Sequence, residues 1–138
     1  MPRLSPWQLP AAVPEILPAD TDALAARLAT VPRLREHHLW EVLRILPSLA
    51  EAREDIGFRR AFRILMERDD LDGASRALVA AARPARRLDR LQALDGVWIA
   101  RIVLTEAAPR RAVAVHGDRR AAVMAALVAL DRPAPSQH

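Results

Sequence analysis

The sequence predicts a mostly helical α+β fold, and three observations lead to that prediction. Apolar stripes at the helical period indicate two amphipathic helices, over Arg33–Leu46 and Ile56–Arg68. A β-branched run of alternating apolar residues spans Val97–Thr105, which is typical of a strand with one buried face. Every residue from Ala121 to Leu130 is apolar, which predicts a helix that is buried on all sides.

Length and composition limit the classes of protein. A chain of 138 residues with 51% apolar residues is expected to form one domain that buries roughly two-thirds of its unfolded surface. The absence of cysteine excludes disulfides, thiolate metal sites and cysteine nucleophiles. No apolar run approaches the ~20 residues that a membrane span requires. We therefore expect a cytoplasmic bacterial protein that needs no cofactor and does not enter a membrane.

The positive charge is carried by arginine alone. All 21 basic residues are arginines, which is typical of a GC-rich genome, and the net charge is only +4. The distribution along the chain is more informative than this total. Residues 76–138 contain eleven arginines and five carboxylates, a net charge of +6. The basic character therefore belongs to the C-terminal half.

Residues 1–18 are predicted to form an extended, Pro-rich N-terminal arm. Prolines at positions 2, 6, 10, 14 and 18 fix φ and bias the preceding residues toward extended conformations. Between these prolines lie Trp7, Leu9, Val13 and Ile16, which are more apolar than a disordered tail requires. We expect the arm to lie on a surface, either that of its own domain or that of a partner. In the second case these four side chains bind the partner.

Residues 19–131 are expected to form a single globular domain whose helical part covers residues 19–95. Leu88, Leu91 and Leu94 recur every three residues, and Gly96 follows as a helix-ending residue. That spacing predicts a helix up to Leu94. Together with the two helices above, the compact bundle then contains shorter helices over Thr21–Val31, Ser48–Asp55, Gly73–Ala82 and Ala85–Leu94.

The β-β-α unit at residues 97–131 completes the predicted domain. Ala112–His116 reads as a second strand, and Asp118 caps a closing helix that ends at Leu130. Because two strands alone are marginally stable, the hairpin is expected to pack on that helix. The other side of the helix then meets the helical part or a second subunit, which makes Met124 and Val128 candidate partner-binding residues. Residues 132–138 are expected to be a flexible tail.

Candidate catalytic or metal-binding residues are few. His37 and Glu41 are four residues apart on a predicted helix, as in helix-borne zinc sites. His38 lies about 100° around the helix from His37, so we predict no metal site. The spacing of Arg33 and His38 resembles the Arg-x4-His motif of helical HEPN-type ribonucleases. The enzymatic alternative is therefore a metal-dependent or ribonuclease activity near His37 and His38, whereas the sequence favours a protein that is not an enzyme.

The arginines of the C-terminal half suggest phosphate binding. Arginine binds phosphate bidentately, and helix N-termini favour anions. The chain is similar to the last half of a double-stranded-RNA-binding domain in having two strands, the run Gly117-Asp118-Arg119-Arg120-Ala121-Ala122 and an Ala-rich helix. Such domains have three strands, and a further basic residue where this chain has Val123. The candidate nucleic-acid-binding residues are Arg83, Arg86, Arg87, Arg90, Arg110, Arg111, Arg119 and Arg120.

The sequence favours an interaction or accessory subunit over an enzyme. We expect it to assemble with itself as an oligomer, or with a larger protein complex, through the N-terminal arm and the apolar C-terminal helix. The alternative is a nucleic-acid-binding or regulatory protein that uses the C-terminal arginines.

Overall fold

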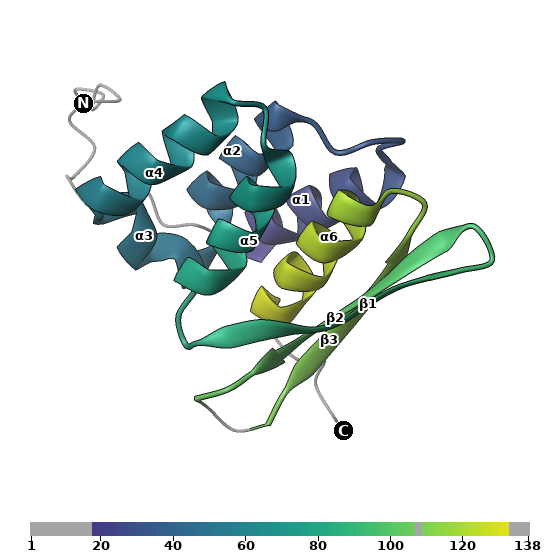
Figure 1. Cartoon of the computed structure of the whole chain (residues 1–138). Coiled ribbons are helices and arrows are strands. Elements are labelled where there is room, and N and C mark those ends of the chain that lie inside the picture. The colour runs from purple at the N-terminus through teal and green to yellow at the C-terminus, as the bar shows by residue number, and fades with distance from the viewer. Residues whose placement is uncertain (1–17, 107–108, 133–138) are drawn as a thin grey trace, which may run out of the picture.

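The computed structural model describes residues 18–106 and 109–132. The mostly helical α+β fold predicted from the sequence is confirmed, with a helical N-terminal part and a sheet closed by a final helix (Figure 1). The helices in the described residues are α1 (Pro18–Thr30), α2 (Glu36–Ile45), the short 3₁₀ turn η2 (Pro47–Leu49), α3 (Ala50–Glu54), α4 (Ile56–Glu67), α5 (Leu71–Ala81) and α6 (Arg119–Asp131). The strands are β1 (Arg86–Leu94), β2 (Val97–Leu104) and β3 (Arg111–His116).

The sheet has three antiparallel strands in the order β1-β2-β3, so the predicted hairpin gains a third strand. The helix predicted over Ala85–Leu94 is wrong, because this segment forms β1 and pairs along its length with β2. The expectation that residues 19–95 are helical throughout therefore fails at its end. Asp95 and Gly96 form the tight turn between the two strands, and both have positive φ, 51° and 81°. Asp-Gly is a strong signal for such a hairpin turn.

A β-bulge explains why β1 resembles a helix in its sequence. The pairing with β2 shifts between Leu88 and Arg90, which adds one residue to β1. Leu88 pairs with Ile102 and Leu91 pairs with Ala100, and both partners are fully buried. Two residues on the same face of a regular strand are two apart, and the bulge makes this separation three. The spacing of three between Leu88 and Leu91 is therefore that of a bulged strand, whereas Leu94, three residues further on, lies on the opposite face of the sheet.

Helix α6 lies between the sheet and the helical part. Figure 1 shows it across one face of the sheet, with α1 and α5 on its other side. Ala121, Met124, Leu127 and Val128 are completely buried. This agrees with the prediction that a helix without a polar face is buried on all sides. The second side of α6 was expected to meet either the helical part or a second subunit. It packs on α1 and α5 of the same chain.

The helical part is held together by a leucine-rich core. Leu24 and Leu28 of α1, Leu39 and Val42 of α2, and Phe62 of α4 are all completely buried. The predicted stripe of α2 therefore points inward, and so does that of α4 except for the exposed Ala61. The predicted boundaries shift by a few residues: α1 begins at Pro18, where the first turn tolerates a proline, and α5 begins at Leu71 because the Asp70 side chain accepts a hydrogen bond from the Gly73 N–H.

Candidate functional site

The face of the sheet opposite α6, which we call the outer face, is a surface that no described helix covers. Figure 1 shows the helices on one side of the sheet only. Ala100 and Ile102 of β2 are completely buried on the helix side. Because successive strand residues alternate between faces, Ile99, Arg101 and Val103 belong to the outer face.

Aliphatic side chains from all three strands meet on the outer face. Val115 of β3 pairs with Ile99 of β2, and Leu94 of β1 pairs with Val97 of β2. Leu94, Val113 and Val115 are 49%, 53% and 60% exposed. An antiparallel sheet with one solvated face ordinarily presents polar residues there. Here the exposed positions form an aliphatic strip instead.

Arginines border this strip. Arg90 pairs with Arg101 across β1 and β2, and Val103 pairs with both Arg87 and Arg111, so four arginines share the outer face. The only carboxylate in the three strands is Asp89 at the bulge, and its Oδ2 lies 2.5 Å from Nη2 of Arg101. The outer face therefore has an excess of positive charge.

Of the residues predicted to bind a partner, the structure describes only Met124 and Val128. Trp7, Leu9, Val13 and Ile16 lie outside the described residues. Met124 and Val128 are completely buried between the sheet and the helical part, so neither side chain is accessible to a partner in the folded chain. The outer face was not among the predicted sites, because β1 was expected to be a helix and a two-stranded hairpin offers little surface.

The structure separates the predicted nucleic-acid-binding arginines into groups with different environments. Arg86 is buried: its Nη1 donates to Oδ1 of Asp131 over 2.6 Å, and both side chains are only 3% exposed. Arg83 donates to the carbonyls of Ala80 and Ala82. Arg86 therefore stabilises the fold and is not available to a nucleic acid, which corrects its assignment.

The other six arginines of the predicted set do not share one surface. Arg110 donates to the carbonyl of Arg132. Arg119 and Arg120 lie at the start of α6, on the helix side of the sheet. The outer face carries the other three, which are Arg87, Arg90 and Arg111. No single surface brings the eight arginines together.

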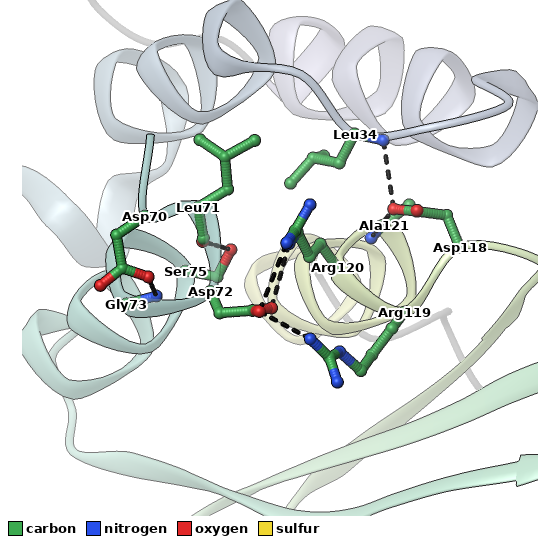
Figure 2. A network of polar contacts seen from close by, with 10 residues as sticks. All are labelled: Leu34, Asp70, Leu71, Asp72, Gly73, Ser75, Asp118, Arg119, Arg120 and Ala121. Carbon is green, nitrogen blue, oxygen red and sulfur yellow. Dashed lines mark hydrogen bonds and ion pairs between the residues drawn. The ribbon is translucent and has the colours of Figure 1, made fainter. Parts of the chain in front are cut away.

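Arg119 and Arg120 form ion pairs with Asp72 of α5 (Figure 2). Nη2 of Arg119 lies 2.6 Å from Oδ2 of Asp72, and Nε of Arg120 lies 3.0 Å from Oδ1. The hydrogen bond from Arg120 lowers the pKa of the Asp72 carboxyl, although partial burial opposes this shift. Trp98 lies beneath Arg119, with the guanidinium carbon 5.7 Å from the ring centroid. Asp72 thus occupies the position that a phosphate would take at these arginines.

Asp118 is the helix cap that the sequence predicts, and it has a second role. Its Oδ2 accepts hydrogen bonds from the N–H of Ala121 and from the N–H of Leu34, at 3.0 and 3.1 Å (Figure 2). His116 Nδ1 accepts a hydrogen bond from the Asp118 N–H, and His116 Nε2 lies 3.0 Å from the carbonyl oxygen of Leu28. The start of α6 is therefore fixed to the helical part by side chains of the chain itself.

The histidine pair has unequal environments. His37 is exposed, whereas His38 is buried and its Nδ1 accepts a hydrogen bond from the Arg35 N–H over 2.8 Å. Arg33, His37 and His38 line a hollow of about 560 Å³ at the connection between α1 and α2. Within residues 18–106 and 109–132, no three His, Asp or Glu side chains are grouped so that they could hold a metal ion.

The stability of the fold should decrease as His38 becomes protonated. Burial, followed by the charge of His37, lowers the pKa of His38 below its usual value of about 6.5. Between that value and the lower folded pKa, the unfolded chain binds more protons, so stability falls as the pH falls through this range. We expect denaturant unfolding from about pH 7.5 to pH 5 to show this loss, and His38→Gln to reduce it.

His37→Gln is the matched control for this prediction. It removes a neighbouring charge but leaves the burial of His38, the largest cause of the shift, so most of the pH dependence should remain. If the free energy of unfolding of His38→Gln fell with decreasing pH as steeply as that of the parent, the buried neutral histidine would not be the source of the pH dependence.

Comparison with protein-family models, with curated proteins and with solved structures gave no significant match. In the part of the chain that the structure describes, no helix is both long enough and apolar enough to span a membrane. The functional conclusion therefore depends on the surfaces described above.

Proposed function

We propose that the protein is a non-enzymatic interaction subunit that binds an acidic, aliphatic protein surface on the outer face of its sheet. The observation that supports this proposal is the exposed strip of Leu94, Val113 and Val115 bordered by arginines. Fully burying an exposed valine or leucine side chain contributes about 1.5–3 kcal/mol, and these half-exposed side chains would each gain about half of that when covered. Arginine is enriched at protein interfaces, and complementary charge increases the rate of association.

The charge of the outer face favours a different protein over a second copy as the partner. If two copies met face to face, Arg87, Arg90 and Arg111 of each chain would approach the same arginines of the other. The strands carry a single carboxylate, Asp89, which is already paired with Arg101. Such like-charge contacts cost several kcal/mol. A partner with aspartate or glutamate around an apolar centre avoids this cost.

The N-terminal arm remains part of this proposal on sequence grounds. Its prolines reduce the freedom that is lost when the segment becomes ordered, and Trp7 is the natural anchor residue. We propose that the arm provides a second contact to the same partner. A cytoplasmic location, as expected for an accessory subunit, belongs to the same proposal.

Introducing acids into the outer face should weaken partner binding while the fold is retained. The double variant Val113→Asp/Val115→Asp alters two exposed side chains and should weaken binding at least tenfold, or about 1.4 kcal/mol. The measurement is quantitative affinity capture from the source cells, followed by titration of the captured protein. Unchanged thermal melts show that the fold is intact.

The matched control is Ile56→Asp/Ile64→Asp, which places the same two charges on exposed aliphatic positions of α4. It should leave the affinity unchanged. Equal binding by both double variants would refute the outer face as the interaction surface. A captured partner whose binding segment lacks acidic residues would refute the charge argument.

A second candidate function, binding of double-stranded RNA, is favoured by one observation. The unpredicted strand β1 gives the order α5-β1-β2-β3-α6, with both helices on one face of a three-stranded sheet (Figure 1). Double-stranded-RNA-binding domains also have three strands. Two features weigh against this candidate: Asp72 is ion-paired with both Arg119 and Arg120, and Val123 is buried where such domains have a further basic residue.

The variant Asp72→Asn tests this second candidate. If RNA binds at the start of α6, removal of the competing carboxylate should increase the affinity for duplex RNA and make binding more salt-dependent. Glu51→Gln, at an exposed position of α3, removes the same charge outside the ion pairs of Arg119 and Arg120 and serves as the control. Gel-shift assays at low salt that detect no binding by either the parent chain or Asp72→Asn would remove this candidate.

A further inference from the structure

A second surface, separate from the sheet, lies where α2, α3 and α4 meet. A hollow of about 380 Å³ opens there, within the size range of roughly 300–1,000 Å³ that is typical of small-molecule sites. Side chains from the three helices converge on it. The apolar part of the lining comes from Trp40 and Leu43, and the charged part comes from Arg44, Arg53, Arg59 and Arg63.

Trp40 provides a fixed aromatic surface in this hollow. Its ring contacts the completely buried Phe62 edge-on, with 4.9 Å between the ring centroids. Phe62 in turn stacks on Phe58, with centroids 5.6 Å apart. Trp40 nevertheless remains 37% exposed. The indole is therefore held in place from within the core while part of it remains open to a ligand, and aromatic side chains bind flat rings by stacking.

Arg53 is also fixed in position. Its Nη1 donates to the carbonyls of Leu43 and Leu46, at 2.7 and 2.8 Å. Burial lowers the pKa of its guanidinium, because the charged form loses part of its hydration. A guanidinium has five N–H donors, and Nε and Nη2 of Arg53 make no hydrogen bond with any described residue. These donors remain available to an anion.

The other three arginines lack a counter-charge in the described residues. Arg44, Arg59 and Arg63 form no ion pair there, and the one carboxylate of the lining, Glu41, is paired with Arg27 over 2.8 Å. Arg59 and Arg63 are one helical turn apart, and like charges at that spacing destabilise a helix by a few tenths of a kcal/mol. An anion bound between these side chains would remove this repulsion.

We propose that this hollow binds a nucleoside diphosphate or a closely similar anion with a flat ring. The ring stacks on the exposed part of Trp40, and the phosphates accept hydrogen bonds from Arg44, Arg59, Arg63 and the free donors of Arg53. Arginine matches phosphate geometry bidentately. Both halves of the ligand contribute to the affinity, because the apolar surface and the cationic rim belong to one hollow. This site is independent of the outer face, so a second function is assigned to the helical part of the chain.

Isothermal titration calorimetry of the full chain at low salt tests the proposal with three probes: ADP, adenosine and inorganic pyrophosphate. ADP should bind at least tenfold more tightly than either fragment. Trp40→Leu should remove the advantage of ADP over pyrophosphate while pyrophosphate binding remains. Arg59→Gln/Arg63→Gln should weaken ADP and pyrophosphate at least tenfold.

The control is Arg60→Gln/Arg68→Gln, which removes one charge from α4 and one from its C-cap, both outside this hollow, and should leave ADP binding within twofold of the parent. Thermal melts of each variant establish that it is folded. If both double arginine variants weakened ADP binding equally, the binding would depend only on nonspecific positive charge, and the proposal would be overturned. The absence of heat with ADP at millimolar concentration, or binding of an acidic peptide in preference to ADP, would also overturn it.

Discussion

Replacing Asp131 by alanine should lower the free energy of unfolding by about 3–5 kcal/mol, because it leaves Arg86 charged and unpaired in the interior. The two side chains lie 2.6 Å apart and are only 3% exposed. The second carboxylate oxygen of Asp131 accepts a hydrogen bond from the Ser48 N–H, so this donor also loses its partner. Against a typical total of about 5–15 kcal/mol, the loss should lower the melting temperature by on the order of 10 °C.

An exposed ion pair of the same chain serves as the control. Asp22 lies 2.8 Å from Nε of Arg132, and both side chains are about half exposed. Asp22→Ala should cost no more than about 1 kcal/mol. The double variant Arg86→Met/Asp131→Leu should recover much of the lost stability, because an apolar pair replaces a buried ion pair at little cost. Denaturant unfolding that ranked Asp22→Ala as the more damaging change would contradict the buried pair.

Phe62→Ala should destabilise the helical part by about 3–5 kcal/mol. Phe62 is completely buried, and its ring contacts both Trp40 and Phe58. Each aromatic contact adds about 0.5–1.5 kcal/mol beyond the area that is buried. The substitution removes both contacts and leaves a cavity between α2 and α4. Thermal or denaturant melts measure the loss.

The neighbouring Arg60 tests whether the orientation of α4 is correct. Its side chain is exposed, so Arg60→Ala should change stability by no more than about 0.5 kcal/mol. A melt in which Arg60→Ala proved more harmful than Phe62→Ala would mean that α4 is rotated about its axis.

The helices were predictable because each carries its own periodic signal. Leu39, Val42 and Leu43 of α2 recur at helical spacing, and the structure buries all three. The all-apolar run of α6 likewise required burial on every side, and the fold provides it. Such local patterns are independent of long-range context, so the sequence sufficed for these elements.

The wrong prediction of a helix at β1 has a local cause, and the sequence also held one signal against that helix. The bulge between Leu88 and Arg90 converts the strand period into a spacing of three, which is also compatible with a helix. The pair Asp95-Gly96 was the signal that argued for a hairpin at this position. A hairpin turn at this position implies a strand before it, and therefore a three-stranded sheet with an outer face.

The role of an individual arginine could not be predicted, because it depends on contacts distant in sequence. Arg86 meets Asp131 across 45 residues, and Arg119 meets Asp72 across 47. In the sequence these arginines belong to the same basic half as Arg87 and Arg111. Only the folded chain shows which of them are paired internally and which border the outer face.

Site-specific photocrosslinking tests the interaction proposal most directly. A photoreactive residue at Val115, which is 60% exposed on strand β3 of the outer face, is compared in the source cells with one at Ile56, which is 66% exposed on α4. We predict a crosslink from Val115 to a different protein, within a segment richer in aspartate and glutamate than in basic residues, and no such product from Ile56. Equal products from both positions, or a Val115 crosslink only to a second copy or to residues 1–17 of the same chain, would contradict the proposal.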